Sequence, residues 1–312
     1  MANFTAKDVK DLRERTGCGM MDCKKALTES NGDVEKAIEF LREKGLAAAA
    51  KKAGRIAAEG LVKTVVSDDD KNAAIVEVNS ETDFVAKNAD FAAFVEEVAA
   101  QALATNATDM DAFMKEAWLS DADSTVEAVL TAKVAVIGEN LKIRRFEKVA
   151  SEDGCVVSYI HGGGKIGVLV KAATEVVNDE VKEALRNIAM QVAALNPKYT
   201  SRDEVDQDYI NNEKEILAAQ ARLEKPDAND KIIDGMVMGR INKELKEICL
   251  LDQVYVKAED GKQTVANYIK DVAKAVGAEI TVKGFVRFET GEGLEKKNED
   301  FAAEVAAQMA GN

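Results

Sequence analysis

The residues best suited to contact another molecule lie between a predicted strand and a predicted helix. Ile75, Val76 and Val78 indicate the strand, because β-branched residues favour extended structure. Residues 79–83 are polar and turn-prone, and the aromatic residue Phe84 follows directly. The sequence therefore displays a carboxylate and a phenyl ring together in a connecting segment, where proteins commonly carry binding residues.

Two interpretations of Phe84 are open. Helical spacing resumes soon after it, because four apolar residues fall at i, i+3, i+4 and i+7: Phe91, Phe94, Val95 and Val98. Phe84 is either displayed for a partner or buried as a core ring at the start of this helix, since aromatic residues are usually buried. In the second case Asp83 would be the N-cap of the helix.

Composition argues against some classes of function. The chain has 312 residues, enough for two or more compact units. Its net charge of −14 argues against a general nucleic-acid binder, which needs basic patches to contact phosphates. Residues 1–55 hold 12 basic and 9 acidic residues, and the remainder holds 30 and 47. A mildly basic head on an acidic body fits electrostatic steering toward a protein partner and fits plain solubility equally well.

Cysteine and histidine are too sparse for a disulfide framework or a zinc site. The chain has a single histidine, His161, and four cysteines: Cys18, Cys23, Cys155 and Cys249. The first residues lack an apolar signal core, and no stretch is long and apolar enough to span a bilayer. We therefore expect a cytoplasmic protein, with a mature organelle protein as the alternative, and neither a bound metal nor a cofactor.

Residues 5–44 predict three short helices. Thr5 and Asp8 form a capping pattern before the first helix. Asp33 can cap the third helix, and Gly45 is expected to end it. A unit of this size has little core and is marginal alone.

The apolar faces of these helices are expected to pack together. The second helix has an inner face of four residues: Met20, Cys23, Ala26 and Leu27. The third has another: Val34, Ala37, Ile38 and Leu41. Residues 46–59 are rich in Ala and Lys and are expected to form a helical linker.

An internal repeat follows. Its first half has two strands around a polar turn and a third strand that closes it: 61–66, 74–78 and 141–147. The second half repeats this order around a glycine-rich turn: 156–160, 166–172 and 284–289. A helix follows the second strand in each half. We predict an α+β fold with a duplicated core of two three-stranded antiparallel sheets covered by helices.

A helical hairpin is predicted to interrupt the second half, because residues 203–224 and 228–248 are helix-like on either side of Lys225-Pro226-Asp227. The first helix has three inward residues: Ile210, Ile216 and Leu217. The second has five: Ile232, Ile233, Met236, Ile241 and Leu245. Such an arm needs a cover for its apolar stripe, either a second copy of the chain or its own domain.

These elements predict five segments. They are a three-helix domain with its linker, the first core subdomain, the second core subdomain in two pieces, the inserted arm and a C-terminal module: 1–55, 56–150, 151–197 with 249–293, 198–248 and 294–312. The last segment is expected to contain a helix, because Phe301, Val305 and Met309 fall at helical spacing.

Two glycine motifs suggest enzyme chemistry and are rejected. Residues 162–167 match the dinucleotide fingerprint, but a strand rather than a helix is predicted after them, so a hairpin turn is the better interpretation. His161 with its glycines resembles an esterase oxyanion loop, but the chain lacks a G-x-S-x-G nucleophile. No phosphate-binding loop of the G-x-x-x-x-G-K-[ST] type occurs. We therefore expect no bond chemistry, and His161 could instead contact a partner.

Five stretches in order resemble the elongation factor Ts family: 17–27, Glu81–Asn88, Ile137–Asn140, Tyr159–Gly162 and 285–289. With the duplicated core and the arm, the resemblance covers nearly the whole chain. It implies a ubiquitin-associated type of fold for the N-terminal three helices. It also implies that the chain is a nucleotide exchange factor for the translation GTPase elongation factor Tu, and not an enzyme.

The resemblance implies a role for the segment around Phe84. Thr82, Asp83, Phe84 and Val85 would dock on the nucleotide domain of elongation factor Tu. Phe84 would act as a wedge that dislodges Mg²⁺, so that GDP leaves and GTP can bind. Neither direct nucleic-acid binding nor membrane binding is expected.

The resemblance also implies supporting contacts: Met20, Met21, Ile137, Gly138, His161 and Phe301. The two methionines and Phe301 would grip the nucleotide domain, the 137–138 pair would support the wedge, and the histidine would reach another domain of the partner. The arm could make a homodimer or a dimer of heterodimers. Two alternatives are a helical peptide-binding adaptor or scaffold, and an enzyme that uses His161 with its glycine-rich loop.

Overall fold

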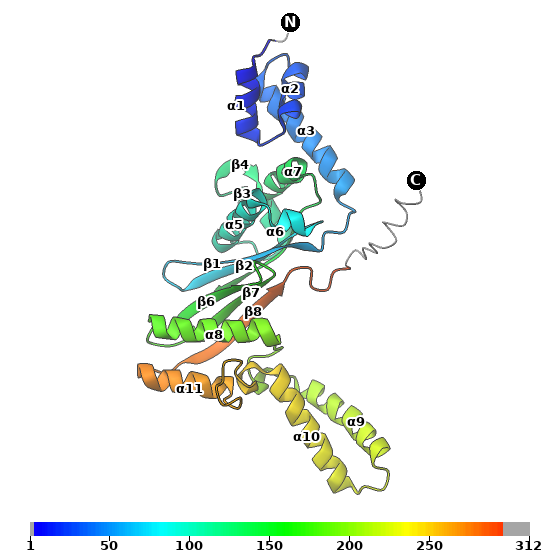
Figure 1. The fold of residues 1–312 in the computed structure, drawn as a ribbon, viewed down its shortest axis with the longest axis vertical. Coiled ribbons are helices and arrows are strands. Elements are labelled where there is room, and N and C mark those ends of the chain that lie inside the picture. The colour runs from blue at the N-terminus through cyan, green and yellow to red at the C-terminus, as the bar shows by residue number, and fades with distance from the viewer. Residues whose placement is uncertain (1–2, 296–312) are drawn as a thin grey trace. The chain divides into compact units, whose positions relative to one another are not determined.

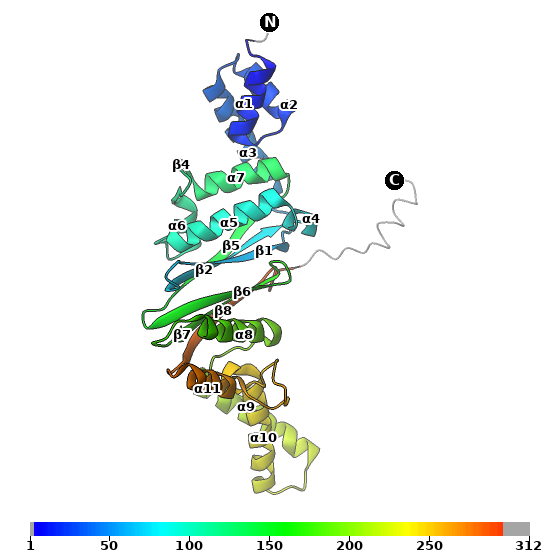
Figure 2. The ribbon, with the colours of Figure 1, turned by 60° about the vertical axis from the view of Figure 1, so that its left-hand side comes forward.

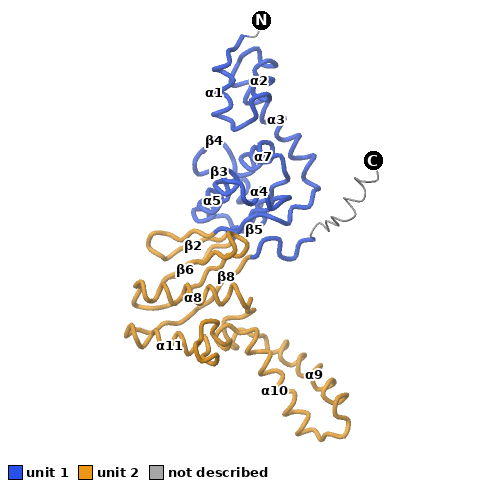
Figure 3. The backbone as a smooth tube through the Cα atoms, viewed as in Figure 1, with its two compact units in different colours: residues 1–63, 76–146, 289–312 blue, residues 64–75, 147–288 orange. Residues whose placement is uncertain are grey.

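The computed structural model describes residues 3–295 and shows an α+β fold with small sheets (Figure 1). Its contacts divide the chain into two compact units, each assembled from separate stretches (Figure 3). Unit 1 comprises residues 1–63, 76–146 and 289–312, and unit 2 comprises residues 64–75 and 147–288. The predicted helix around Phe301 lies outside the described residues.

The N-terminal helices of unit 1 pack around a small apolar core. They are α1 (Ala6–Thr16), α2 (Met20–Glu29) and α3 (Val34–Lys52). Thr5 and Asp8 form the predicted reciprocal cap of α1, and Asp33 caps α3. The core is made of side chains from all three helices: Val9, Leu12, Cys23, Ala26, Leu27, Ala37 and Leu41.

Two predictions about these helices were wrong. Gly45 does not end α3 but lies buried inside it, and the helix continues to Lys52. At Gly45 an added Cβ would lie 3.5 Å from the Ala135 Cβ of α7 (Val126–Ile137), and α3 packs along α7. This packing offsets the low helix propensity of glycine, a cost of about 1 kcal/mol. Met20 is not on the inner face of α2, because its side chain is 45% exposed.

The first sheet has the strand order β1-β2-β5. Its strands are β1 (Glu59–Val66), β2 (Asn72–Ser80) and β5 (Lys142–Ala150). In unit 1 the helices between β2 and β5 lie on one side of this sheet (Figures 1 and 2). They are α4 (Asp83–Ala86), α5 (Ala89–Ala104), α6 (Met110–Lys115) and α7, joined by a hairpin of β3 (Ala117–Trp118) and β4 (Asp121–Thr125). The sequence analysis anticipated only α5 among these.

Unit 2 contains most of the second sheet, whose order is β6-β7-β8. Its strands are β6 (Gly154–His161), β7 (Ile166–Ala173) and β8 (Thr281–Glu289). His161 pairs with Ile166 across an antiparallel hairpin, and the glycines between them have φ angles of 59°, 65° and 100°. The predicted glycine-rich turn is therefore confirmed, since an L side chain would be strained at such angles. Two helices complete the core of this unit: α8 (Asp179–Leu195) and α11 (Val265–Val276).

The predicted helical hairpin is present in unit 2 as α9 (Gln207–Glu224) and α10 (Asp230–Ile248), flanked by short 3₁₀ turns at Arg202–Glu204 and Leu250–Asp252. The two helices pack on each other through one apolar cluster: Val205, Ala221, Ile233, Val237, Ile241, Leu245 and Cys249. Ile216 and Ile232 were wrongly placed on the inner faces, because their side chains are 43% and 48% exposed. Adjacent helical residues point about 100° apart, so the next residue in each helix, Leu217 or Ile233, packs in the cluster instead.

Candidate partner-binding site

Phe84 is displayed to solvent. Its side chain is 80% exposed on the one-turn helix α4, whereas the other phenylalanines of residues 3–295 are buried or half-buried. The interpretation of Phe84 as a core ring is therefore wrong. Burying a phenyl ring on a partner would contribute about 1.5–3 kcal/mol, which makes Phe84 a candidate anchor for an interface.

Strand β2 brings the chain to this position. The predicted polar break at residue 79 is wrong, because β2 continues through Ser80 and buries both Asn79 and Ser80. The Asn79 Nδ2 donates to Glu77 Oε1 at 3.0 Å and to the Glu59 carbonyl at 3.1 Å. The Ser80 hydroxyl donates to the Thr82 carbonyl at 3.0 Å. Polar residues can continue a buried strand when their donors are satisfied in this way.

The connecting segment after β2 is clamped by a carboxylate from another part of unit 1. Glu139 Oε2 accepts hydrogen bonds from the backbone amides of Glu81 and Thr82, at 3.0 Å and 3.1 Å. Glu139 Oε1 accepts a third from the Thr82 hydroxyl at 2.6 Å. In return, the Asn140 amide donates to Glu81 Oε1 at 2.6 Å. These hydrogen bonds join residues 81–82 to residues 139–140. We call Glu81, Thr82, Glu139 and Asn140 together the Glu139 clamp.

Gly138 makes the clamp possible by ending α7. Its φ is 87°, a left-handed conformation that favours glycine, and its N–H donates to the Val134 carbonyl. The chain turns there, and Glu139 and Asn140 reach the segment after β2. Ile137 lies half-buried in the last turn of α7. The structure thus places the predicted Gly138 beside the Phe84 segment through the residues that follow it.

Thr82, not Asp83, is the N-cap of α4, because its Oγ1 accepts from the Val85 amide at 3.4 Å. Asp83 lies in the first turn and pairs with Lys87 Nζ at 2.6 Å. Asn88 then caps α5 by accepting from the Asp90 amide at 2.8 Å. Phe84 therefore lies on a short helix between its own N-cap, Thr82, and the N-cap of α5.

Three residues missed by the sequence analysis shape this site besides Asn140: Arg55, Glu81 and Glu139. The Arg55 guanidinium lies 3.4 Å from Glu81 Oε1. The backbone carbonyl of Arg55 accepts a hydrogen bond from Asn140 Nδ2 at 2.8 Å. Glu81 and Glu139 stand next to predicted site residues, which was the available signal. Sequence reasoning cannot show that residues 58 apart in the chain touch.

The other predicted contacts lie on separate elements. Met20 and Met21 are 45% and 73% exposed at the start of α2. His161 belongs to unit 2, where it is exposed and its Nδ1 lies 2.9 Å from the Tyr159 hydroxyl. Phe301 lies outside the described residues. The structure therefore brings together the residues around Thr82, Phe84 and Gly138, while the remaining predicted contacts stay predictions.

No group of three or more His, Cys, Asp or Glu side chains in residues 3–295 could hold a metal ion. In the same part of the chain, every helix is too short or too polar to cross a membrane.

Comparison with known proteins matches these features to one family. The family model described as "Elongation factor TS" matches residues 81–292, which include the Glu139 clamp and Phe84. Elongation factor Ts of Clostridium botulinum (strain Eklund 17B / Type B) is 56% identical over 307 residues, covering 98% of this chain and 99% of the relative. Elongation factor Ts of Clostridioides difficile (strain 630) is 56% identical over 309 residues, covering 99% of this chain and 100% of the relative.

Proposed function

The chain belongs to the elongation factor Ts family of translation elongation factors, and from this premise we propose that it is a guanine nucleotide exchange factor. Its partner is elongation factor Tu with bound GDP, and its effect is to release the GDP so that GTP can bind. The observation that carries the proposal is the exposure of Phe84, 80%, on a clamped turn within the matched region.

Phe84 is proposed to act as a wedge in the nucleotide domain of elongation factor Tu, flanked by Thr82, Asp83 and Val85. Its insertion would dislodge the Mg²⁺ ion that would offset the phosphate charge of GDP. Loss of the ion weakens the affinity for GDP. Linkage makes the effect reciprocal, so bound nucleotide weakens the affinity for the exchange factor by the same factor.

One phenyl ring does not supply enough free energy for the whole effect, so further contacts are part of the proposal. Met20, Met21 and Phe301 would bind the same domain, and His161 would bind another domain. Ile137 and Gly138 would act on the wedge through the Glu139 clamp. Such a protein makes and breaks no bond and is not an enzyme.

The proposal extends to the organisation of the chain. The five predicted segments are retained, with 1–55 as the ubiquitin-associated-like domain and 198–248 as an arm able to pair two copies. The protein would act in the cytoplasm, where translation takes place, without direct contact with nucleic acid or membrane.

Release of a fluorescent GDP analogue from elongation factor Tu, followed by stopped flow, tests the proposal. The wild-type chain should accelerate release in a concentration-dependent manner. Phe84→Ala should lower this acceleration about 10- to 100-fold, because about 1.5–3 kcal/mol of burial is lost and each 1.4 kcal/mol is a factor of ten.

Leu119→Ala provides the matched control, because Leu119 is also an exposed apolar residue of unit 1, at 59%. It should leave the release rate unchanged. A folded Phe84→Ala variant that releases GDP as fast as the wild-type chain would remove the wedge from the mechanism. Absence of any acceleration by the wild-type chain would refute the exchange function and favour the adaptor.

A further inference from the structure

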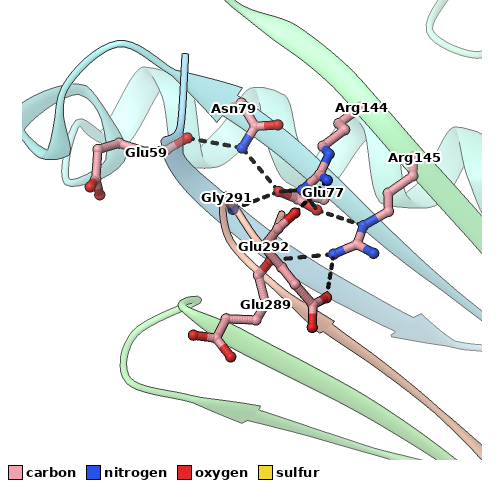
Figure 4. A network of polar contacts seen from close by, with 8 residues as sticks. All are labelled: Glu59, Glu77, Asn79, Arg144, Arg145, Glu289, Gly291 and Glu292. Carbon is pink, nitrogen blue, oxygen red and sulfur yellow. Dashed lines mark hydrogen bonds and ion pairs between the residues drawn. The ribbon is translucent and has the colours of Figure 1, made fainter. Parts of the chain in front are cut away.

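A fully buried carboxylate lies in strand β2, shortly before the Phe84 segment. Glu77 is 0% exposed, and four residues donate hydrogen bonds to it (Figure 4). Arg144 Nη1 lies 2.9 Å and 3.1 Å from the two carboxylate oxygens, and Arg145 Nε lies 2.6 Å from Oε2. Oε1 also accepts from Asn79 Nδ2 at 3.0 Å and from the Gly291 amide at 2.8 Å.

A second carboxylate of this cluster, that of Glu292, lies 3.2 Å from Arg145 Nη2. Burial alone would raise the pKa of the Glu77 carboxyl. The surrounding donors outweigh burial and hold that pKa below its usual value: the Gly291 amide, Asn79, Arg144 and Arg145. Glu77 is therefore an anion at neutral pH and needs every one of these partners, since an unpaired buried charge is costly.

The cluster binds one short segment, residues 289–292. Arg144 Nη2 donates to the Glu292 carbonyl at 2.5 Å, and Arg145 Nη2 donates to the Glu289 carbonyl at 3.3 Å. With the Gly291 amide and the Glu292 carboxylate, the segment is held through both its backbone and a side chain. Figure 4 shows the segment beside Glu77, starting at Glu289, the last residue of β8.

Backbone geometry restricts this segment further. Gly291 has a φ of 72°, and an added Cβ would lie 2.2 Å from the Ala58 carbonyl oxygen. The site therefore accepts only glycine without a shift of the backbone. A buried ion cluster is seldom more stabilising than apolar packing of the same volume, but it accepts far fewer geometries. The hydrogen bonds of the cluster and the close approach at Gly291 together restrict where residues 289–292 can lie.

The residues of the Glu139 clamp lie just outside the same two strands. Glu77 lies in β2, which leads directly to residues 81 and 82 of the clamp. Arg144 and Arg145 lie in β5, which begins two residues after Asn140. The strands that present Phe84 therefore also hold residues 289–292.

We propose that Glu77 is a positioning residue for partner binding, which anchors residues 289–292 and so fixes the point from which the C-terminal segment reaches the partner. The inference rests on the proposed exchange function. Phe301 lies nine residues after Glu292, and nine residues span at most about 30 Å. Loss of the anchor leaves the position of residues 289–292 less restricted, which lowers the effective concentration of the predicted Phe301 contact. Half-saturation should then need more protein, while the limiting release rate, set by Phe84, stays unchanged.

The first test is Glu77→Gln in the full chain, which keeps the shape of the side chain and removes its charge. Hydrogen–deuterium exchange without a partner should speed up at residues 289–292 and stay unchanged at residues 81–85. In stopped-flow release of the GDP analogue, the half-saturating concentration should rise at least fivefold at an unchanged limiting rate. The control is Glu96→Gln, which removes the exposed carboxylate that pairs with Lys63 and should change neither measurement.

Gly291→Ala is the second test, because it displaces the segment while leaving every charge of the cluster in place. It keeps the proposal falsifiable where Glu77→Gln does not fold, and it should give the same rise in half-saturating concentration. Combining Glu77→Gln with Phe301→Ala should change this concentration by less than the product of the two single effects, since both act through one segment.

Different outcomes identify different failures. A folded Glu77→Gln or Gly291→Ala variant with an unchanged half-saturating concentration overturns the positioning role, as does a double variant whose effects multiply. A wild-type chain that does not accelerate release overturns the exchange function. In that event, unchanged hydrogen exchange at residues 289–292 of Glu77→Gln would refute the anchor as well.

Discussion

At the scale of single residues, the site depends on carboxylates that are not themselves candidates for contact. Glu139 accepts from two amides and a hydroxyl of the segment before Phe84, and Glu77 accepts from four residues around the segment after β8. Both are acceptors of several donors, and hydrogen bonds to charged groups are the stronger ones. The exposed Phe84 is oriented by such interactions because its own ring makes little contact with the chain.

Removal of the Glu139 carboxylate should therefore impair exchange without direct contact with the partner. Glu139→Ala leaves two backbone amides and the Thr82 hydroxyl without their acceptor, so we expect faster hydrogen exchange at residues 81–85 and about tenfold slower GDP release. Glu127→Ala, an exposed change at the other end of α7, is the control and should alter neither. Unaltered release by a folded Glu139→Ala variant would contradict the role of the clamp.

Glu77 should also give the protein a specific pH dependence. Its pKa is lowered in the folded state, so the unfolded chain binds more protons and the stabilisation from Glu77 is lost as the pH falls below about 4.5, the ordinary value. The difference in free energy of unfolding between wild type and Glu77→Gln should be constant above that pH and shrink below it. Urea unfolding between pH 3.5 and 7 measures this difference, and a constant difference would contradict the ionised assignment.

Residue-level prediction from the sequence succeeded where a local pattern existed. The caps at Thr5 and Asp33 were predicted, because a cap and its helix are neighbours in the chain. The exposure of Phe84 was left open, since one aromatic residue after a strand fits a core and a surface equally well. Glu77 and Glu139 were not found, because their meaning lies in partners 67 and 58 residues away.

At the scale of elements, the periodicity of apolar residues predicted most strands and missed several helices. The strands of both halves were found, as were α8 and the arm. Helix α7 has apolar residues all round and so shows no face, because it is contacted by α3, α6, β3 and β4. Helix α11 could have been predicted, since Val265, Ile269, Val272 and Val276 fall at helical spacing. The extension of α3 through Gly45 depends on α7, which local propensity does not include.

The arm offers a test of helix packing with two adjacent isoleucines. Ile233 is buried in the cluster between α9 and α10, whereas Ile232 is 48% exposed. Ile233→Ala should lower the free energy of unfolding by about 2–5 kcal/mol through a cavity, and Ile232→Ala should change it by less than about 0.5 kcal/mol. Chemical denaturation at several protein concentrations measures both. A large, concentration-dependent cost for Ile232→Ala would instead show that a second copy covers this face.

At the scale of the whole molecule, the proposed contacts are divided between two compact units. Phe84, Met20 and Met21 belong to unit 1, and His161 belongs to unit 2. The repeat in the sequence predicted the two sheets, but the discontinuous composition of each unit was not visible, because it depends on contacts between distant stretches. The family, by contrast, was accessible from five short stretches in order, and the comparisons confirm it.

Contacts in different units should act independently. His161→Ala should raise the half-saturating concentration in the release assay, and its effect should combine with that of Phe84→Ala to within about 0.5 kcal/mol of additivity. A double-mutant cycle measured at one salt concentration tests this. Tyr159→Phe removes the hydroxyl beside His161 Nδ1 and controls for the orientation of the ring. Strong non-additivity would show that the two side chains act through one shared element.

The contact between Glu77 and Gly291 can form only late in synthesis of this stretch on the ribosome. Gly291, whose amide donates to Glu77, comes 214 residues after Glu77 in the chain. At about 5–20 residues per second, a ribosome needs roughly 10–40 s to synthesise this stretch. During that interval Glu77 can pair with Arg144 and Arg145 once these have been synthesised, but it lacks the Gly291 amide. The strands that present Phe84 thus acquire this partner only after Gly291 has been synthesised.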